Sequence, residues 1–263
     1  MTELVDIHCH LLPEIDDGAA DLTESLAMAR LSVEQGVGTV ICTPHQLGAF
    51  HFNRGDDIRY RVGCLQAELD QAEIPLRVLA GADVRIEDGM VDRLRSGDVL
   101  TLADHGRHVL LELPHELYFP LEGLLDSLAA ASMVGVLSHP ERNGGLLSRP
   151  ELIDSLVDRG CLMQVTAGSL TGAFGLASRE LARQMAQRGA IHFLSTDAHG
   201  ATRRRPRLGD ALREAESLVG EQAAHAWCVE FPMAVAQGRD VPAGHYAVRP
   251  PRRGWSLFKR SAA

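Results

Sequence analysis

Short apolar runs recur along this chain at intervals of roughly 30 residues, and each is followed by a segment with helical character. This alternation is typical of repeated βα units, whose strands form parallel sheets and barrels. Seven runs have this character: 4–10, 38–45, 77–86, 108–114, 134–141, 161–167 and 191–199. The pattern predicts an α/β fold in which seven strands form a TIM-like barrel.

The segments between these runs carry the apolar periodicity of amphipathic helices. In the segment 21–35, one helical face is expected to pack on the barrel, and Gly36 is expected to end the helix. That face comprises Leu22, Leu26, Ala29 and Val33. Further helices are predicted at 56–72, 121–132, 151–159, 176–188 and 206–219.

No linker rich in Gly, Ser or Pro divides the chain, so residues 1–248 are predicted to form one domain. The segment 249–263 differs because it is basic, contains proline and is only weakly periodic. It is predicted to be a loose C-terminal tail. Two roles stay open for it: a solvated end with no function, or docking on an acidic partner.

Composition excludes several classes of function. The net charge of −9 disfavours a protein that binds nucleic acid through its phosphates. No apolar run reaches the roughly 18 residues of a membrane span, so no integral membrane segment is expected. The five cysteines are scattered and include no C-x-x-C pair, which disfavours a disulfide framework or a structural zinc site. A cytoplasmic protein is expected.

Metal-ligand residue types stand at the ends of six of the seven predicted strands. The ends of barrel strands converge on one face, where barrel enzymes place their active sites. We therefore expect these side chains to meet, together with Asp17 from the loop after the first strand. The full set of candidate ligands is His8, His10, Asp17, His45, Asp83, Glu112, His139, Asp197 and His199.

Two of the strand ends carry paired ligand types. Side chains two apart on a strand point to the same face, so His8 with His10, and Asp197 with His199, are each expected to bind from one face. Cys9 is then expected to point into the core. Imidazole and carboxylate donors without thiolate suit Zn²⁺, Mn²⁺ or Fe. Nine donors are too many for one ion, so two or three divalent ions are expected.

Basic and aromatic residues follow the same strand ends. Arg142 and the run 203–205 have the positions and the bidentate geometry to hold phosphate oxygens. The aromatic residues that could surround an aromatic substrate are Phe50, His51, Phe52, Tyr118 and Phe119.

These residues together resemble the PHP (polymerase and histidinol phosphatase) superfamily, and within it the bacterial protein-tyrosine phosphatases of capsule and exopolysaccharide loci. The resemblance extends from residue 4 to about residue 235. The matching segments, in family order, are VDIHCH (5–10), IDDGA (15–19), CTPH (42–45), LAGADVR (79–85), LLE (110–112), SHPER (138–142), QVTAGSLTG (164–172) and STDAH (195–199).

The resemblance implies a distorted seven-stranded barrel and a three-metal centre bound by the nine candidate ligands. It implies that Arg142 and Arg204 hold the phosphate, and that Asp17 belongs to the catalytic set as well as to the ligands. The implied substrate is phosphotyrosine on a bacterial tyrosine kinase that controls capsule or exopolysaccharide synthesis. One departure matters: Asp83 stands where the family has glutamate, which puts the occupancy of one ion in question.

Alternative functions remain at this stage. A PHP-type phosphatase for a small phosphomonoester such as histidinol phosphate would use the same metals. A metal-binding regulatory module without turnover is a further alternative. A cysteine phosphatase is disfavoured, because no cysteine is followed six positions later by arginine.

A hydroxide activated by the metals is therefore the expected nucleophile, without a phosphoenzyme. The proton donor to the leaving group stays open between a metal-bound water and a rim histidine such as His51.

Overall fold

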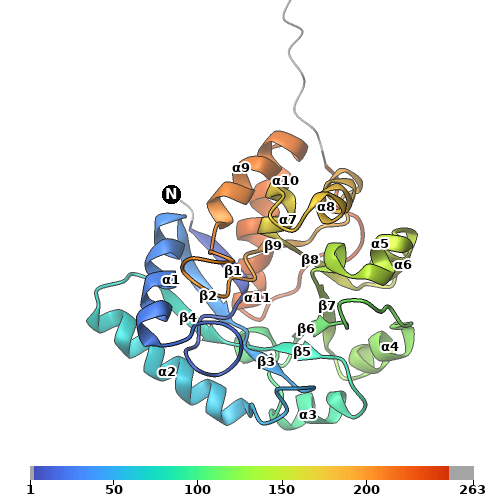
Figure 1. Ribbon diagram of the computed structural model, residues 1–263. Coiled ribbons are helices and arrows are strands. Elements are labelled where there is room, and N and C mark those ends of the chain that lie inside the picture. The colour runs from blue at the N-terminus through green and yellow to red at the C-terminus, as the bar shows by residue number, and fades with distance from the viewer. Residues whose placement is uncertain (1–2, 249–263) are drawn as a thin grey trace, which may run out of the picture.

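All seven predicted strand regions form parallel strands in the computed structural model, which describes residues 3–248 (Figure 1). One sheet has the order β1 (Leu4–Cys9), β2 (Val37–Cys42), β4 (Arg77–Ala80). The other has the order β3 (His45–Gln46), β5 (Asp83–Arg85), β6 (His108–Glu112), β7 (Val134–Ser138), β8 (Leu162–Thr166), β9 (Phe193–Ser195). The predicted α/β fold is confirmed, and the predicted tail, 249–263, lies outside the described residues.

The second and third predicted strands are each broken into two, which explains why residues 3–248 contain nine strands instead of seven. Pro44 separates β2 from β3, and proline has no N–H to donate to a strand ladder. Gly81 precedes β5, and a Cβ there would lie 2.7 Å from Cγ2 of Ile41. At these breaks, the two predicted strands pass from the first sheet (β2 and β4) into the second (β3 and β5). The Asp83 amide still donates to the Pro44 carbonyl at 3.1 Å, which holds the two breaks together.

The two sheets also approach each other at β1, beyond the end of β9. The Asp197 amide donates to the His8 carbonyl at 2.7 Å, and the His10 amide donates to the Ala198 carbonyl at 2.9 Å. The pairing is an isolated parallel bridge between Cys9 and Ala198 and not a full ladder. The barrel is therefore distorted, and this bridge lies directly beside the candidate ligands His8, His10 and Asp197.

Helices surround the strands (Figure 1). The six predicted helices are all present with bounds within two residues of those expected: α1 (Leu22–Glu34), α2 (Gly55–Gln71), α4 (Glu122–Ala130), α6 (Glu151–Asp158), α8 (Leu176–Arg188) and α9 (Leu208–Val219). Shorter helices were not predicted: α3 (Met90–Ser96), α5 (Gly144–Ser148), α7 (Ala167–Thr171), α10 (Glu221–His225) and α11 (Phe231–Ala236). Within residues 3–248, no helix combines the length and apolar character needed to cross a membrane.

The inner face of α1 is broader than the predicted one. Ala29 is buried as expected, and Leu22, Leu26 and Val33 pack against the core while partly buried. The other fully buried positions are Ser25, Met28 and Ser32. The Ser25 hydroxyl donates to the Leu11 carbonyl at 2.7 Å, and Ser32 donates to the Met28 carbonyl at 3.0 Å. A buried hydroxyl with a partner is tolerated in the interior, so serines can occupy a face that hydrophobicity alone would not assign to them.

His192 is a buried histidine that joins the chain after α11 to the core of the second sheet. Its Nδ1 accepts the Met163 amide at 3.0 Å, and its Nε2 donates to the Gly244 carbonyl at 3.1 Å. Only neutral imidazole can accept and donate in this way. Burial lowers the pKa of His192 to about 4.

This depressed pKa predicts a specific acid sensitivity. The unfolded chain binds a proton at His192 near pH 6.5 and the folded chain only near pH 4, so stability is lost as the pH falls between those values. Between pH 7.5 and 5, His192 should account for about 2 kcal/mol of the loss in unfolding free energy. Urea unfolding of the parent and of His192→Gln at both pH values measures this, because both proteins keep the same metal-ligand residues. Equal pH dependence in the two proteins would contradict the assignment.

Candidate metal centre

All nine predicted ligands meet at one mouth of the barrel, although they come from seven separate segments of the chain. Four groups of donor atoms have all their members within 4.8 Å of one another: His10, Asp17, His45 and His199; His8, His10 and Asp197; His8, Asp83 and His139; His45, Asp83 and Glu112. Four residues belong to two groups each: His8, His10, His45 and Asp83. Shared donors of this kind are what neighbouring ions in one cluster require.

The loop after β9 places its two candidate ligands by a route that strand alternation did not predict. β9 ends at Ser195, so Asp197 and His199 lie in the loop that follows, and the backbone of Asp197 has φ 49°. His139, after β7, also has positive φ, at 34°. Non-glycine residues rarely adopt this conformation, and they cluster at functional sites. The expectation that the Asp197 and His199 pair projects from a regular strand was wrong, although both side chains do reach the site.

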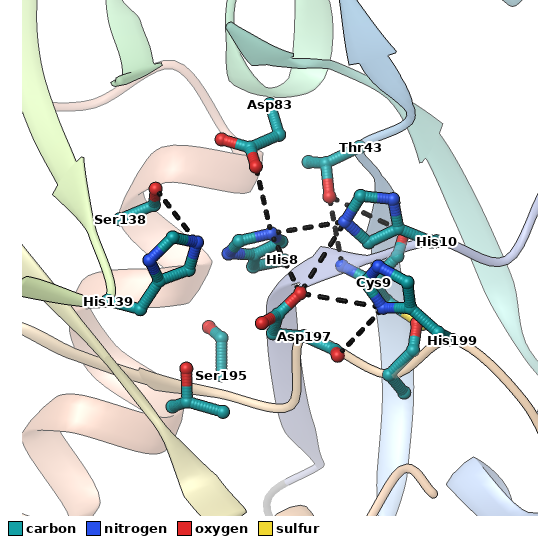
Figure 2. Close-up of polar contacts among 12 residues, drawn as sticks. His8, Cys9, His10, Thr43, Asp83, Ser138, His139, Ser195, Asp197 and His199 are labelled. Atoms are coloured by element: carbon teal, nitrogen blue, oxygen red, sulfur yellow. Dashed lines mark hydrogen bonds and ion pairs between the residues drawn. The ribbon is translucent and has the colours of Figure 1, made fainter. Parts of the chain in front are cut away.

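Two histidines are oriented by residues that the sequence did not single out. His8 Nδ1 lies 2.8 Å from Oε1 of Gln164, and His10 Nδ1 lies 2.7 Å from Oδ2 of Asp16. The opposite nitrogens, both Nε2, then face Oδ1 of Asp197 at 3.3 and 3.5 Å (Figure 2). A hydrogen bond on one ring nitrogen fixes which nitrogen is presented to a metal. Because each metal-binding histidine needs such a partner, a search of the sequence for partners of His8 and His10 could have found Gln164 and Asp16, which adjoins Asp17.

Asp83 is the residue that most needs a cation. Its side chain is fully buried, with Oδ2 3.6 Å from His8 Nε2 and 3.4 Å from His45 Nδ1. Neither carboxylate oxygen has a hydrogen-bond partner among residues 3–248. A buried carboxylate without a donor is costly unless a charge compensates it. Carboxylate and imidazole groups around an oxygen without a hydrogen-bond donor fit a divalent ion, so the residues present fit the expected metals.

The charges of the cluster are strongly coupled. Burial, followed by the negative charge of Asp83, raises the pKa of Glu112 to about 7. Burial would also raise the pKa of the Asp83 carboxyl, but the charges of His8 and His45 hold it below its usual range. Burial lowers the pKa of His139, and the nearby Arg142 adds to this. Asp83 is thus held ionised by its neighbours, and His139 is held neutral by burial, which are the forms in which these two residue types bind metals.

Asp197 connects the ligand cluster to the two predicted phosphate-binding arginines. Its Oδ1 faces His8, and its Oδ2 accepts hydrogen bonds from Nη1 of Arg142 and Nη2 of Arg204. Among the three consecutive arginines, only Arg204 turns inward in this way, since the neighbouring Arg203 and Arg205 are exposed. The structure therefore brings Arg142 and Arg204 together at the site.

One of the five aromatic candidates lies at the cluster. The ring of Phe50 stacks on His45 with centroids 5.2 Å apart and lines a hollow of about 310 Å³ with Arg85 and Glu112. Tyr118 instead lies under Arg149, Phe119 lines another hollow beside α3 and α4, and Phe52 and His51 are exposed. A histidine that the sequence reasoning missed, His115, stacks on His139 at 5.6 Å.

Comparison with known proteins agrees with this geometry. A family model described as capsular polysaccharide synthesis, CpsB/CapC, matches residues 4–237. The tyrosine-protein phosphatase YwqE of Bacillus subtilis is 35% identical over 221 residues, which is 83% of this chain and 86% of that protein.

The chain belongs to the CpsB/CapC family. A solved structure of 31% identity superposes with a TM-score of 0.86 and covers 92% of this chain and 99% of the other. It comes from work on YwqE of Bacillus subtilis and CpsB of Streptococcus pneumoniae, described as unique metal-dependent tyrosine phosphatases. A phosphotriesterase homology protein from Escherichia coli, 13% identical with a TM-score of 0.59, shares the fold; it covers 88% of this chain and 97% of the other.

The cysteines of this CpsB/CapC-family chain are all free, and only Cys64 is exposed. Cys9 is fully buried, as predicted from its position on β1. Burial, together with Asp6 and Cys42 nearby, raises the pKa of the Cys9 thiol. Because the thiolate is the reactive form, a buried thiol of this kind is unsuited to be a nucleophile.

Asp83→Ala is expected to lower the number of divalent ions bound per chain, because Asp83 is shared by two of the four donor groups. Asp83→Glu, the residue that the family resemblance leads us to expect here, should bind as many ions as the parent. Elemental analysis of the purified, metal-loaded variants measures the stoichiometry. Asp158→Ala, at an exposed carboxylate on α6, is the control. An unchanged ion count in Asp83→Ala would remove Asp83 from the set of ligands.

Proposed function

We propose that this chain is a metal-dependent protein-tyrosine phosphatase, a phosphoric monoester hydrolase. The observation that carries the proposal is the position of Asp197, which faces the imidazole cluster with one oxygen and binds both arginines with the other. A single carboxylate, that of Asp197, thus contacts both the candidate cation ligands and the candidate phosphate donors. The names of the family's relatives support the same activity.

The nine clustered residues are proposed as the ligands of two to three divalent ions, with manganese, zinc or iron suited to these donors. When bound, the ions would lower the pKa of a coordinated water and neutralise charge on the phosphoryl group. Asp17 is the most exposed of the nine, with 58% of its side chain accessible. It lies 3.4 Å from Nε2 of both His45 and His199, so it stands where substrate enters.

Arg142 and Arg204 are proposed to bind the phosphoryl oxygens. Their side chains are 12% and 31% exposed, so each keeps a face toward the mouth while it donates to Asp197. A planar guanidinium offers several N–H groups in a fixed fork, so one group can bind a carboxylate and a phosphate together. Asp197 then serves to aim the arginines at the phosphoryl group. With the buried thiols set aside, direct hydrolysis without a phosphoenzyme is the reaction that these residues favour.

The proposed substrate is phosphotyrosine on a protein, and the proposed protein is a bacterial tyrosine kinase that controls capsule or exopolysaccharide synthesis. The family's description, capsular polysaccharide synthesis, supports this biological setting. The stacked Phe50 and His45 rings beside the cluster offer an apolar wall to an aromatic leaving group. A cytoplasmic site of action fits five cysteines that are all unpaired.

Metal-loaded protein is expected to hydrolyse a phosphotyrosine peptide well above histidinol phosphate, and chelation should abolish turnover until metal is returned. Phosphate release measured on both substrates, before and after chelation, separates the alternatives. A preference for histidinol phosphate would favour the small-molecule phosphatase. Loaded protein inert toward both substrates would favour a binding module, and full activity after exhaustive demetallation would end the proposal.

Arg142→Ala and Arg204→Ala are each expected to lower kcat by about 10² to 10³, the usual effect of removing one donor to a transition-state oxyanion. Metal content should stay at the parent's value, because neither residue is a ligand. Arg203→Ala is the matched control, since Arg203 is exposed and adjoins Arg204. Steady-state kinetics on the phosphotyrosine peptide provide the readout. Parent-like turnover in either variant would show that the arginine in question has no role in phosphate binding.

A further inference from the structure

Phe174 contacts both of the proposed phosphate-binding arginines. Its ring centroid lies 4.2 Å from Cζ of Arg142 and 5.9 Å from Cζ of Arg204. The ring is partly buried, in the turn between α7 and α8. A guanidinium over an aromatic face is attracted by the negative face of the ring. One aromatic ring therefore holds two cations that approach the same carboxylate.

The segment 164–172, which carries the family's AGSLTG sequence, explains how the ring reaches this position. Residues Ala167–Thr171 form α7, and Gly172, with φ 95°, reverses the chain so that the Ala173 amide donates to the Gly168 carbonyl at 2.7 Å. The ring of Phe174 then lies over Gly168, where a Cβ would be only 2.8 Å from Cε2 of the ring. Gly168 is therefore the residue that leaves space for the ring.

Glu141 attaches this segment to the arginines. Its side chain is fully buried, and Oε1 accepts the Ser169 hydroxyl at 2.7 Å and the Thr166 amide at 3.0 Å. Glu141 immediately precedes Arg142 in the 3₁₀ helix Pro140–Arg142. The backbone that carries Arg142 and the helix that leads to Phe174 are thus joined by two buried hydrogen bonds.

The two arginines need such support, because like charges that converge on one oxygen repel each other. Without a partner on its other face, each guanidinium would lose orientation as a long, flexible side chain. The ring satisfies one face of Arg142 and leaves its N–H edge free for oxygen ligands, since cation–π contact uses the face and hydrogen bonds use the edge.

We propose that Phe174, held in place by the segment 164–172, is a positioning residue that orients Arg142 and Arg204 toward the phosphoryl group. This inference rests on the proposed phosphatase function. It also assigns a role to the AGSLTG sequence, whose six residues include none of the nine clustered side chains.

The direct test is Phe174→Leu, which keeps an apolar side chain and removes the aromatic face. On the phosphotyrosine peptide, kcat/KM should fall about 5- to 30-fold, as expected for weakening two cation–π contacts. Phe174→Tyr and Phe174→Trp should stay within about 3-fold of the parent, because both retain a ring. Metal content and thermal stability should be unchanged in all three. Parent-like kinetics in Phe174→Leu, or equal losses in the Tyr and Trp variants, would overturn the proposal.

A double-mutant comparison separates positioning from a structural effect. If Phe174 acts through the arginines, Phe174→Leu should have less than about a 2-fold further effect in the Arg142→Ala, Arg204→Ala background. A full additional loss in that background would contradict the proposal.

Titration of inorganic phosphate into metal-loaded protein adds a readout that does not need turnover. Phe174→Leu should weaken phosphate binding, and Phe174→Tyr should not. If the parent does not hydrolyse phosphotyrosine, the proposed function fails, while the phosphate titration still decides the role of Phe174. If the parent is active and binds phosphate no better than Phe174→Leu, only the positioning role fails.

Discussion

The buried carboxylate of Asp83 is the constraint around which the candidate site is arranged. It lies in the interior between two imidazoles, with no hydrogen-bond partner for either oxygen in the described part of the chain. Burying a carboxylate without a hydrogen-bond donor is costly, even beside two imidazoles. Divalent ions bound at the four donor groups would remove that cost. The cluster also gives a physical reason for the broken strands, because the breaks at Pro44 and Gly81 bring His45 and Asp83 to the barrel mouth together.

Several residues that orient the side chains of the cluster and the two arginines come from one stretch of chain, residues 164–174. Gln164 orients His8, Ser169 and the Thr166 amide bind Glu141, and Phe174 contacts both arginines. Residues 164–174 therefore support the imidazole side and the arginine side of the site at once. Groups that hold catalytic side chains in place matter because small errors in geometry cost large factors in rate.

The sequence predicted the strands, the long helices and the convergence of all nine candidate ligands, because polar residues at the ends of parallel strands must meet. It missed features that only tertiary contacts create. The left-handed conformations of His139 and Asp197 follow the ends of β7 and β9, and the burial of Ser25 and Ser32 on α1 requires the hydrogen bonds that they make. The sequence did not indicate that Phe174 contacts the arginines, because that contact depends on how the ring packs against Gly168 in the folded chain.

The nine clustered side chains are proposed to hold the metal ions that the reaction requires. Anomalous diffraction from crystals of the metal-loaded, active protein tests this proposal most directly, because the signal locates the ions independently of any assumed coordination. At least two anomalous peaks are expected at the barrel mouth, one of them within coordination distance of an Asp83 oxygen and all of them bounded by donor atoms of the four groups. Peaks found only elsewhere in an active, fully loaded crystal would contradict it.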